Sequence, residues 1–241
     1  SVPGLLPVRD DLGRLFLDLA EEFGLGLWWG TFDSGVHWMR DSWWREVELN
    51  KPFIDEVAHR YGASPAFRGW YLCHETGSHT HHIARLFREI GGHCRQALDR
   101  PVLVSPFPMG PKQFAGASAF TLEETVEHWD RVFEEAAGAV DVCAFQDGQI
   151  HYRDLPEFHV GMREIAERHG LKLWANVESF DRDMPIKFPP ADWRYLRLKM
   201  EEASKVAEKI VTFEFAHFMS PHSCYPAAHN LFRRYSEELG L

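Results

Sequence analysis

The chain has 241 residues, of which 45% are hydrophobic, and a formal net charge of −10. This length and apolar content suffice to bury the core of one α/β domain. The acidic balance argues against a nucleic-acid partner, because binding to a phosphate backbone needs clustered Lys and Arg. No stretch approaches the roughly 20 apolar residues of a membrane span.

The chain starts at Ser1 without a basic and then apolar leader, so it is either cytoplasmic or a mature or trimmed form. Of these we favour a secreted or periplasmic location over a cytoplasmic one. The four cysteines lie far apart and form no CxxC pair, which excludes a zinc ribbon and a dense disulfide scaffold.

Helical and extended patterns alternate from the start of the chain. Residues 9–23 predict an amphipathic helix, with Leu12 and Phe16 among apolar residues at helical spacing. Residues 25–32 (LGLWWGTF) predict a strand that leads into a polar loop, and residues 43–61 predict the next helix, which Gly62 ends.

The middle of the chain repeats this order. Residues 67–75 (FRGWYLCHE) predict a strand, and residues 81–98 predict a helix after a polar loop. The strand 101–107 (PVLVSPF) follows, and the helix 121–137 begins with the capping-box pattern TLEE.

The second half continues the alternation. In chain order, the predicted elements are strand 141–148, helix 155–169, strand 171–180, helix 191–209, strand 210–218 and helix 227–239.

Six strands, each followed by a helix, predict a parallel sheet with right-handed crossovers. No linker divides residues 1–241, so we expect a single domain. No strand ends in the GxGxxG turn of a doubly wound sheet. Polar side chains instead end strand after strand, which is typical of a (β/α)8 TIM-type barrel. The count falls short of eight, so the first strand is irregular within residues 2–8 or lies upstream.

Glutamates at the carboxyl ends of strands are the candidate catalytic residues. Because strand side chains alternate between faces, Glu178 shares a face with Asn176, and Glu75 shares one with Tyr71. Glycoside hydrolysis needs two carboxyl groups flanking one bond. We therefore assign Glu75 as general acid/base and Glu178 as nucleophile or second carboxylate. The alternative for Glu178 is a structural role, capping the next helix or pairing with an arginine such as Arg182.

Further polar and aromatic side chains at strand ends are expected to contact substrate: Trp29, Tyr71, Gln146, Asp147, Asn176, Glu214 and His217. Asn176 would bond a sugar hydroxyl or orient Glu178, and Glu214 would hold a hydroxyl or exchange roles with Glu178. Gln146 and Asp147 precede Gly148, so they could equally build a turn. For all of these, a buried structural network is the competing interpretation.

Histidines cluster in one loop, where His79, His81 and His82 lie close to His74. Their spacing matches neither HExxH nor a paired HxH motif at the end of a first strand, so we assign no metal and no cofactor.

The chain resembles the DUF4434 family of glycoside-hydrolase-like TIM barrels. The matching pieces are GWYLCHE at 69–75, VLVSPFP at 102–108, DVCAFQDG at 141–148, LWANVESF at 173–180 and FEFAHFMSP at 213–221. The resemblance implies a (β/α)8 barrel related to retaining glycosidases, with a pocket formed by Glu75, Gln146, Asp147, Asn176 and Glu178. The family's opening strand is not evident before Arg9.

The leading hypothesis is a glycoside hydrolase of the retaining, two-carboxylate type that acts on a poly- or oligosaccharide without a cofactor. The second is a carbohydrate-binding barrel without catalysis. The third is a metal-dependent hydrolase that uses the His-rich loops. The expected partner is a carbohydrate, and the sequence carries no signal of oligomeric state.

Overall fold

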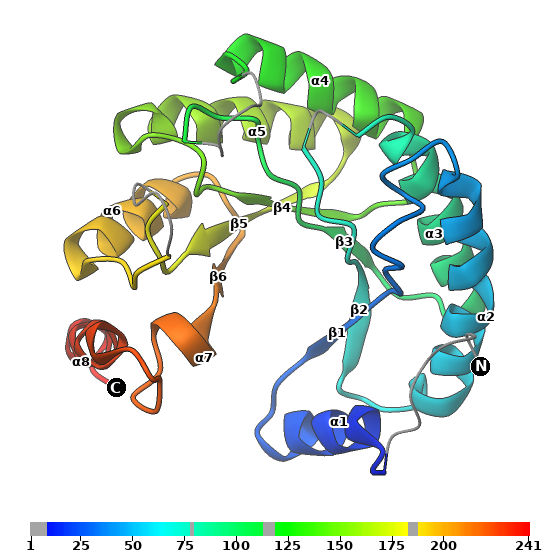
Figure 1. Cartoon of the computed structure of the whole chain (residues 1–241), viewed down its shortest axis with the longest axis horizontal. Coiled ribbons are helices and arrows are strands. Elements are labelled where there is room, and N and C mark those ends of the chain that lie inside the picture. The colour runs from blue at the N-terminus through cyan, green and yellow to red at the C-terminus, as the bar shows by residue number, and fades with distance from the viewer. Residues whose placement is uncertain (1–8, 78–79, 113–118, 183–187) are drawn as a thin grey trace. The chain divides into compact units, whose positions relative to one another are not determined.

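The computed structural model describes residues 9–77, 80–112, 119–182 and 188–241 (Figure 1). The irregular strand expected within residues 2–8 and the candidate ligand His79 lie outside these residues. The chain packs into two compact units. The first comprises Ser1–Val104 with Arg131–Val142, and the second comprises Ser105–Asp130 with Cys143–Leu241. The expectation of a single domain stays a prediction.

The first unit alternates helices and parallel strands. Its main elements are α1 (Leu12–Glu22), β1 (Leu27–Gly30), α2 (Trp43–Tyr61), β2 (Phe67–Leu72), α3 (Ile83–Ala97) and β3 (Val102–Val104). β2 pairs in parallel with β1 on one side and with β3 on the other. The close pairing with β1 requires Gly69, because a Cβ there would lie 2.3 Å from the Trp28 ring.

The second unit carries the later repeats. Its elements are α4 (Leu122–Glu135, whose last residues belong to the first unit), β4 (Val142–Gln146, whose first residue belongs to the first unit), the 3₁₀ turn η1 (Tyr152–Asp154), α5 (Leu155–His169), β5 (Lys172–Glu178), α6 (Trp193–Ser204), β6 (Lys209–Phe213), α7 (Phe215–Phe218) and α8 (Pro226–Leu239). β5 and β6 pair in parallel, with Glu178 opposite Phe213. The predicted capping box is confirmed, because Thr121 N donates to Glu124 and Glu124 N donates to Thr121 Oγ1.

Alternation along β5 separates a core face from a site face. Ala175 and Val177 are buried in an apolar cluster with residues of α6 and α8. Trp174 and Asn176, on the opposite face, are only partly buried. Burial of the first face at roughly 25 cal/mol per Å² of apolar surface anchors the strand, so the register that places Glu178 is set by its apolar neighbours.

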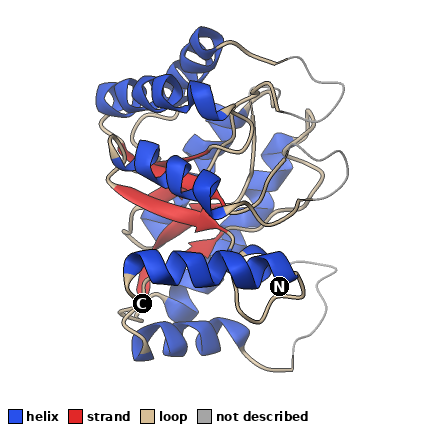
Figure 2. Ribbon diagram, turned by 90° about the vertical axis from the view of Figure 1, so that its left-hand side faces the viewer, coloured by secondary structure: helices blue, strands red, loops and turns tan. Residues whose placement is uncertain are grey.

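All six predicted strands end earlier in the structure than in the sequence pattern, and for two of them this moves a candidate site residue out of its strand. The strands are short, three to seven residues, beside helices of up to 19 residues (Figure 2). β2 ends at Leu72, so Glu75 lies in the loop that follows. β6 ends at Phe213, because the Glu214 side chain accepts hydrogen bonds from Ala216 N and His217 N and starts the one-turn helix α7.

The apolar stripe of α1 is exposed. Leu12, Leu15 and Phe16 have exposed fractions of 51%, 47% and 55%, whereas Leu17 and Ala20 are buried. Among the described residues no helix is long and apolar enough to span a membrane.

Candidate functional site

Glu178 is the last residue of β5 and is held by an arginine. Its carboxylate is almost fully buried, with 1% of the residue exposed. Arg182 donates from Nε to Oε2 at 2.7 Å and from Nη2 to Oε1 at 2.5 Å. This two-point geometry is the strong form of a carboxylate–guanidinium pair. The pairing with Arg182 that the sequence left open is therefore present.

Burial raises the pKa of the Glu178 carboxyl, and the hydrogen bond and charge of Arg182 offset only part of that rise. The charge of Asp147 adds to the rise, whereas Lys199 opposes it. The environment of Glu178 thus balances desolvation against two cations.

A buried ion pair fixes the backbone of Glu178. Asp147 Oδ1 accepts from Glu178 N at 3.0 Å and from Lys199 Nζ at 2.8 Å. Lys199 Nζ also donates to the carbonyl oxygen of Glu178 at 2.8 Å. Asp147 is 1% exposed and Lys199 is 4% exposed. In this arrangement Asp147 positions Glu178, and the substrate contact expected of Asp147 stays a prediction.

Gly148 lies directly against the carboxylate. A Cβ at this position would be 1.7 Å from Glu178 Oε2. The glycine of the Gln-Asp-Gly sequence therefore lets the Glu178 carboxylate pack directly against the backbone, where any side chain would collide with it.

Asn176 and Gln146 share Ser105 as a partner. Asn176 Nδ2 donates to Ser105 Oγ at 2.9 Å, and Gln146 Nε2 donates to the Ser105 carbonyl at 3.0 Å. Asn176 Oδ1 is buried and has no hydrogen-bond partner in the described part of the chain. The amide is thereby oriented with a free acceptor beside the strand end that carries Glu178.

In the first unit, Glu75 is exposed in the loop after β2. Burial raises the pKa of the Tyr71 hydroxyl, and the nearby charge of Glu75 raises it further. Glu75 and Glu178 belong to different units, and the expected convergence of their carboxylates stays a prediction.

Trp29 packs within the first unit. Its ring stacks on Tyr61 of α2 with centroids 4.6 Å apart, and it lies parallel to Phe67 at 6.0 Å. The stacking of Trp29 on Tyr61 packs β1 against α2. The role of Trp29 as a platform for a sugar ring stays a prediction.

Glu214 and His217 are paired with each other in the turn of α7. His217 is mostly exposed, and its Nδ1 contacts the Glu214 carboxylate. Their expected substrate contacts are likewise untested predictions.

Sequence reasoning missed a buried polar cluster at the ends of β1 and β2. Glu46, on α2, is fully buried, accepts from Ser34 N at 2.9 Å, and lies 3.2 Å from His74 Nε2. Asn50, one helical turn later, bonds the backbone N and O of Phe32, each at 2.9 Å. The sequence did contain a sign of this cluster. Glu46 and Asn50, at positions i and i+4, lie on the same helix face as the buried Ile54 and Val57.

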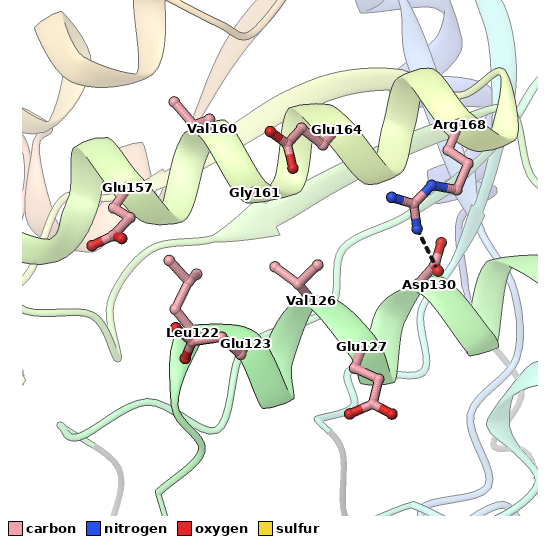
Figure 3. Close-up of a pocket in the computed structure, with 10 residues that line it drawn as sticks. All are labelled: Leu122, Glu123, Val126, Glu127, Asp130, Glu157, Val160, Gly161, Glu164 and Arg168. Carbon is pink, nitrogen blue, oxygen red and sulfur yellow. Dashed lines mark hydrogen bonds and ion pairs between the residues drawn. The ribbon is translucent and has the colours of Figure 1, made fainter.

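A separate groove of about 530 Å³ lies between α4 and α5 in the second unit (Figure 3). Leu122, Val126 and Val160 give it apolar walls, and Arg168 pairs with Asp130 at 2.5 Å. Five carboxylates also line it, those of Glu123, Glu127, Asp130, Glu157 and Glu164. No predicted site residue lines this groove, which is acidic and formed by helices.

Residues 5–225 match the model of the family described as "Domain of unknown function (DUF4434)". No curated protein matches the chain.

Among solved structures, the chain is similar to a candidate alpha-L-fucosidase from Bacteroides thetaiotaomicron VPI-5482, with 37% sequence identity and a TM-score of 0.92. That match covers 98% of this chain and 74% of the other. It is also similar to an endo-1,4-beta-D-mannanase from Thermotoga petrophila RKU-1, at 14% identity, covering 98% of this chain and 84% of the other, with a TM-score of 0.58.

A xylanase from Cellvibrio japonicus matches at 12% identity over 85% of this chain and 71% of its own, with a TM-score of 0.53. At these low identities the mannanase and the xylanase support the fold alone. The similarities confirm the predicted fold class, a TIM-type barrel of glycosidase-like fold, of which the described residues show six strands.

Proposed function

Because the chain belongs to the DUF4434 family, we propose that it is a glycoside hydrolase that cleaves an oligo- or polysaccharide, with Glu178 as nucleophile and Glu75 as general acid/base. The observation that carries the proposal is the position of Glu178. It ends a parallel strand of a glycosidase-like fold, where such barrels carry their catalytic groups.

The surroundings of Glu178 suit a nucleophile. A glycosidase nucleophile must be ionised when it attacks the anomeric carbon. Burial raises the pKa of Glu178, and the hydrogen bond and charge of Arg182 counter part of that rise and favour the ionised form. The same burial excludes the water that would weaken electrostatic interactions with the transition state. Asp147 and Lys199 hold the Glu178 backbone, so the carboxylate is pre-positioned.

Asn176 supports recognition of a hydroxyl. Its Nδ2 is occupied by Ser105, and its buried Oδ1 is left to accept a hydrogen bond. A sugar hydroxyl is a donor of the right kind, and an unmatched buried acceptor discriminates strongly against ligands that lack the donor.

Glu75 suits the acid/base role because it is exposed. In a retaining mechanism this residue protonates the leaving oxygen and then deprotonates a water molecule. After the first step the residue is a carboxylate, and it takes its proton back from the attacking water, which reaches an exposed position directly.

The first substrates to test are α-L-fucosides, because the 37% identical structure is described as a candidate alpha-L-fucosidase. Aryl glycosides of other sugars and linear mannan and xylan complete the panel. Release of aglycone or of shorter glycans, followed by mass spectrometry, reports cleavage.

The decisive variants are Glu178→Gln and Glu75→Gln, with Glu56→Gln as matched control, since Glu56 forms a surface pair with Arg60. Each site variant should lower kcat by roughly 10²- to 10⁴-fold while substrate binding persists. The control should retain wild-type turnover. Undiminished turnover in either site variant on a cleaved substrate would remove that residue from its role.

One observation favours a second function. Both carboxylate oxygens of Glu178 accept hydrogen bonds from Arg182, and a carboxylate held in this way would suit a carbohydrate-binding barrel without catalysis. Saturable binding of a glycan, with no cleavage by wild type across the panel, would establish that alternative in place of hydrolysis.

A further inference from the structure

Three potential metal ligands lie together in the first unit. Asp33 follows β1, Glu46 lies near the start of α2 and His74 follows β2. Each offers one ligand atom within 4.8 Å of the others. Glu46 and His74 are buried, whereas Asp33 is exposed. The cluster is therefore shielded from water at Glu46 and His74 and accessible to solvent at Asp33.

The negative charge of this cluster has no cationic side chain to balance it. Within the described ranges, no Lys or Arg forms an ion pair with Asp33 or Glu46, and the one charged partner of Glu46 is the titratable ring of His74. The two carboxylates therefore have no permanently cationic side chain beside them. Uncompensated charge in a half-buried site favours binding of a cation.

The spacing of the Glu46 and His74 ligand atoms fits a small cation. Nε2 of His74 and Oε1 of Glu46 are 3.2 Å apart. Two ligand atoms on zinc bonds of the usual length, at a tetrahedral angle, would be about 3.3 Å apart. The other ring nitrogen, Nδ1, is buried without a hydrogen-bond partner in the described chain. An unpaired buried nitrogen is uncommon and points to a histidine with more than a packing role.

Neighbouring groups already orient the carboxylates. Asp33 Oδ1 accepts from Trp38 Nε1 and from Gly35 N, each at 2.7 Å. Ser34 bonds both oxygens of Glu46. The Trp38 ring stands edge-on to His74 at 5.5 Å. Hydrogen bonds to the ligands and an apolar wall are the usual surroundings of a metal site.

We propose that Asp33, Glu46 and His74 bind one divalent first-row metal ion, with water completing its coordination. One imidazole and two carboxylates match the preferences of Zn²⁺ and Mn²⁺ better than those of Ca²⁺, which takes oxygen ligands. The proposal is independent of glycoside hydrolysis and of the loop histidines His81 and His82.

The test is isothermal titration calorimetry of untagged, chelator-treated protein with ZnCl₂ and MnCl₂ near neutral pH. Wild type should bind one equivalent of at least one of the two ions, and the ion should raise Tm as its concentration rises. Asp33→Asn, at an exposed position, should weaken binding at least tenfold. Glu46→Gln should weaken it further, with circular dichroism verifying that this variant is folded.

Two controls separate the cluster from adventitious binding. Asp55→Asn alters another Asp–His pair of the first unit, with 2.8 Å between Asp55 Oδ1 and His93 Nε2, and should bind like wild type. The double variant His81→Gln/His82→Gln should also bind like wild type. The proposal is overturned if wild type binds neither ion with 1:1 saturation, if Asp33→Asn binds unchanged, or if only the loop-histidine variant loses binding.

Discussion

The two units hold the carboxylates of their polar clusters in opposite ways. In the second unit, Glu178 and Asp147 are matched by Arg182 and Lys199 at 2.5–2.8 Å. In the first unit, Glu46 and Asp33 are held by a hydroxyl, backbone amides, an indole and an imidazole. A carboxylate neutralised by its own chain is fixed in geometry, whereas one without a cation can accept a metal ion or a proton. The carboxylates of the second unit are therefore fixed by their ion pairs, whereas those of the first unit are able to bind a metal ion or a proton.

The largest effect is expected when a cation is removed from the second unit. Lys199→Met should destabilise the protein by roughly 3–5 kcal/mol, because Asp147 would remain buried without its charge partner. Urea denaturation measures the change. Lys205→Met, at the exposed pair with Glu202, should cost less than about 1 kcal/mol.

The double variant Asp147→Asn/Lys199→Met should recover part of that loss, because no unpaired charge would remain. Equal destabilisation by the Lys199 and Lys205 variants would show that the buried pair contributes no more than a surface pair, and the contrast between the units would fail.

A second, smaller effect concerns the close packing at Glu178. Gly148→Ala should cost about 1–3 kcal/mol, because the added Cβ meets a carboxylate that Arg182 prevents from moving away. Turnover on any cleaved glycoside should fall with it. Gly92→Ala, on helix α3 with open space around its Cα, should be neutral or stabilising. A fully stable and active Gly148→Ala variant would mean that the Glu178 carboxylate is not fixed.

The smallest effect is a pH dependence that belongs to the first unit. Burial opposes ionisation of Glu46, but hydrogen bonds from His74 and Ser34 outweigh it and hold the pKa of Glu46 below its usual 4.5. The ionised form therefore stabilises the fold above pH 4.5, and that contribution is lost as the pH falls through the lowered pKa.

Denaturant midpoints measured from neutral pH down to about pH 3 test this linkage. Glu46→Gln should be less stable than wild type near neutrality and should show a shallower decline in acid. Parallel curves for the two proteins would mean that the carboxylate of Glu46 does not contribute in its charged form.

Local patterns predicted much of this fold. Helices over 43–61 and 155–169 begin and end as the sequence indicated, because periodicity and terminal glycines are local signals. The alternation that assigned Ala175 and Val177 to the core also holds. The predicted strand 210–218 was too long, because the apolar alternation continues past the end of β6 at Phe213. The Glu214 side chain caps the helical turn that follows, and no periodicity in the sequence indicates that turn.

The candidate site was harder to predict because its decisive groups come from elsewhere in the chain. Arg182 could be named as a partner because it lies four residues from Glu178. Lys199 could not, since a lysine on a helix is normally solvated and its burial depends on Asp147, 52 positions away. Glu46 and Asn50 went unnoticed for the same reason, because their partners lie in the loops after β1 and β2.

The uncovered leucines and Phe16 of α1 have a practical consequence for measuring this protein. Apolar side chains on a native surface bind environment-sensitive dyes such as ANS, which are otherwise used to detect molten globules. The folded protein should therefore be fluorescent with such dyes at room temperature, and brightness alone would mimic partial unfolding. Far-ultraviolet circular dichroism reports the transition without that background.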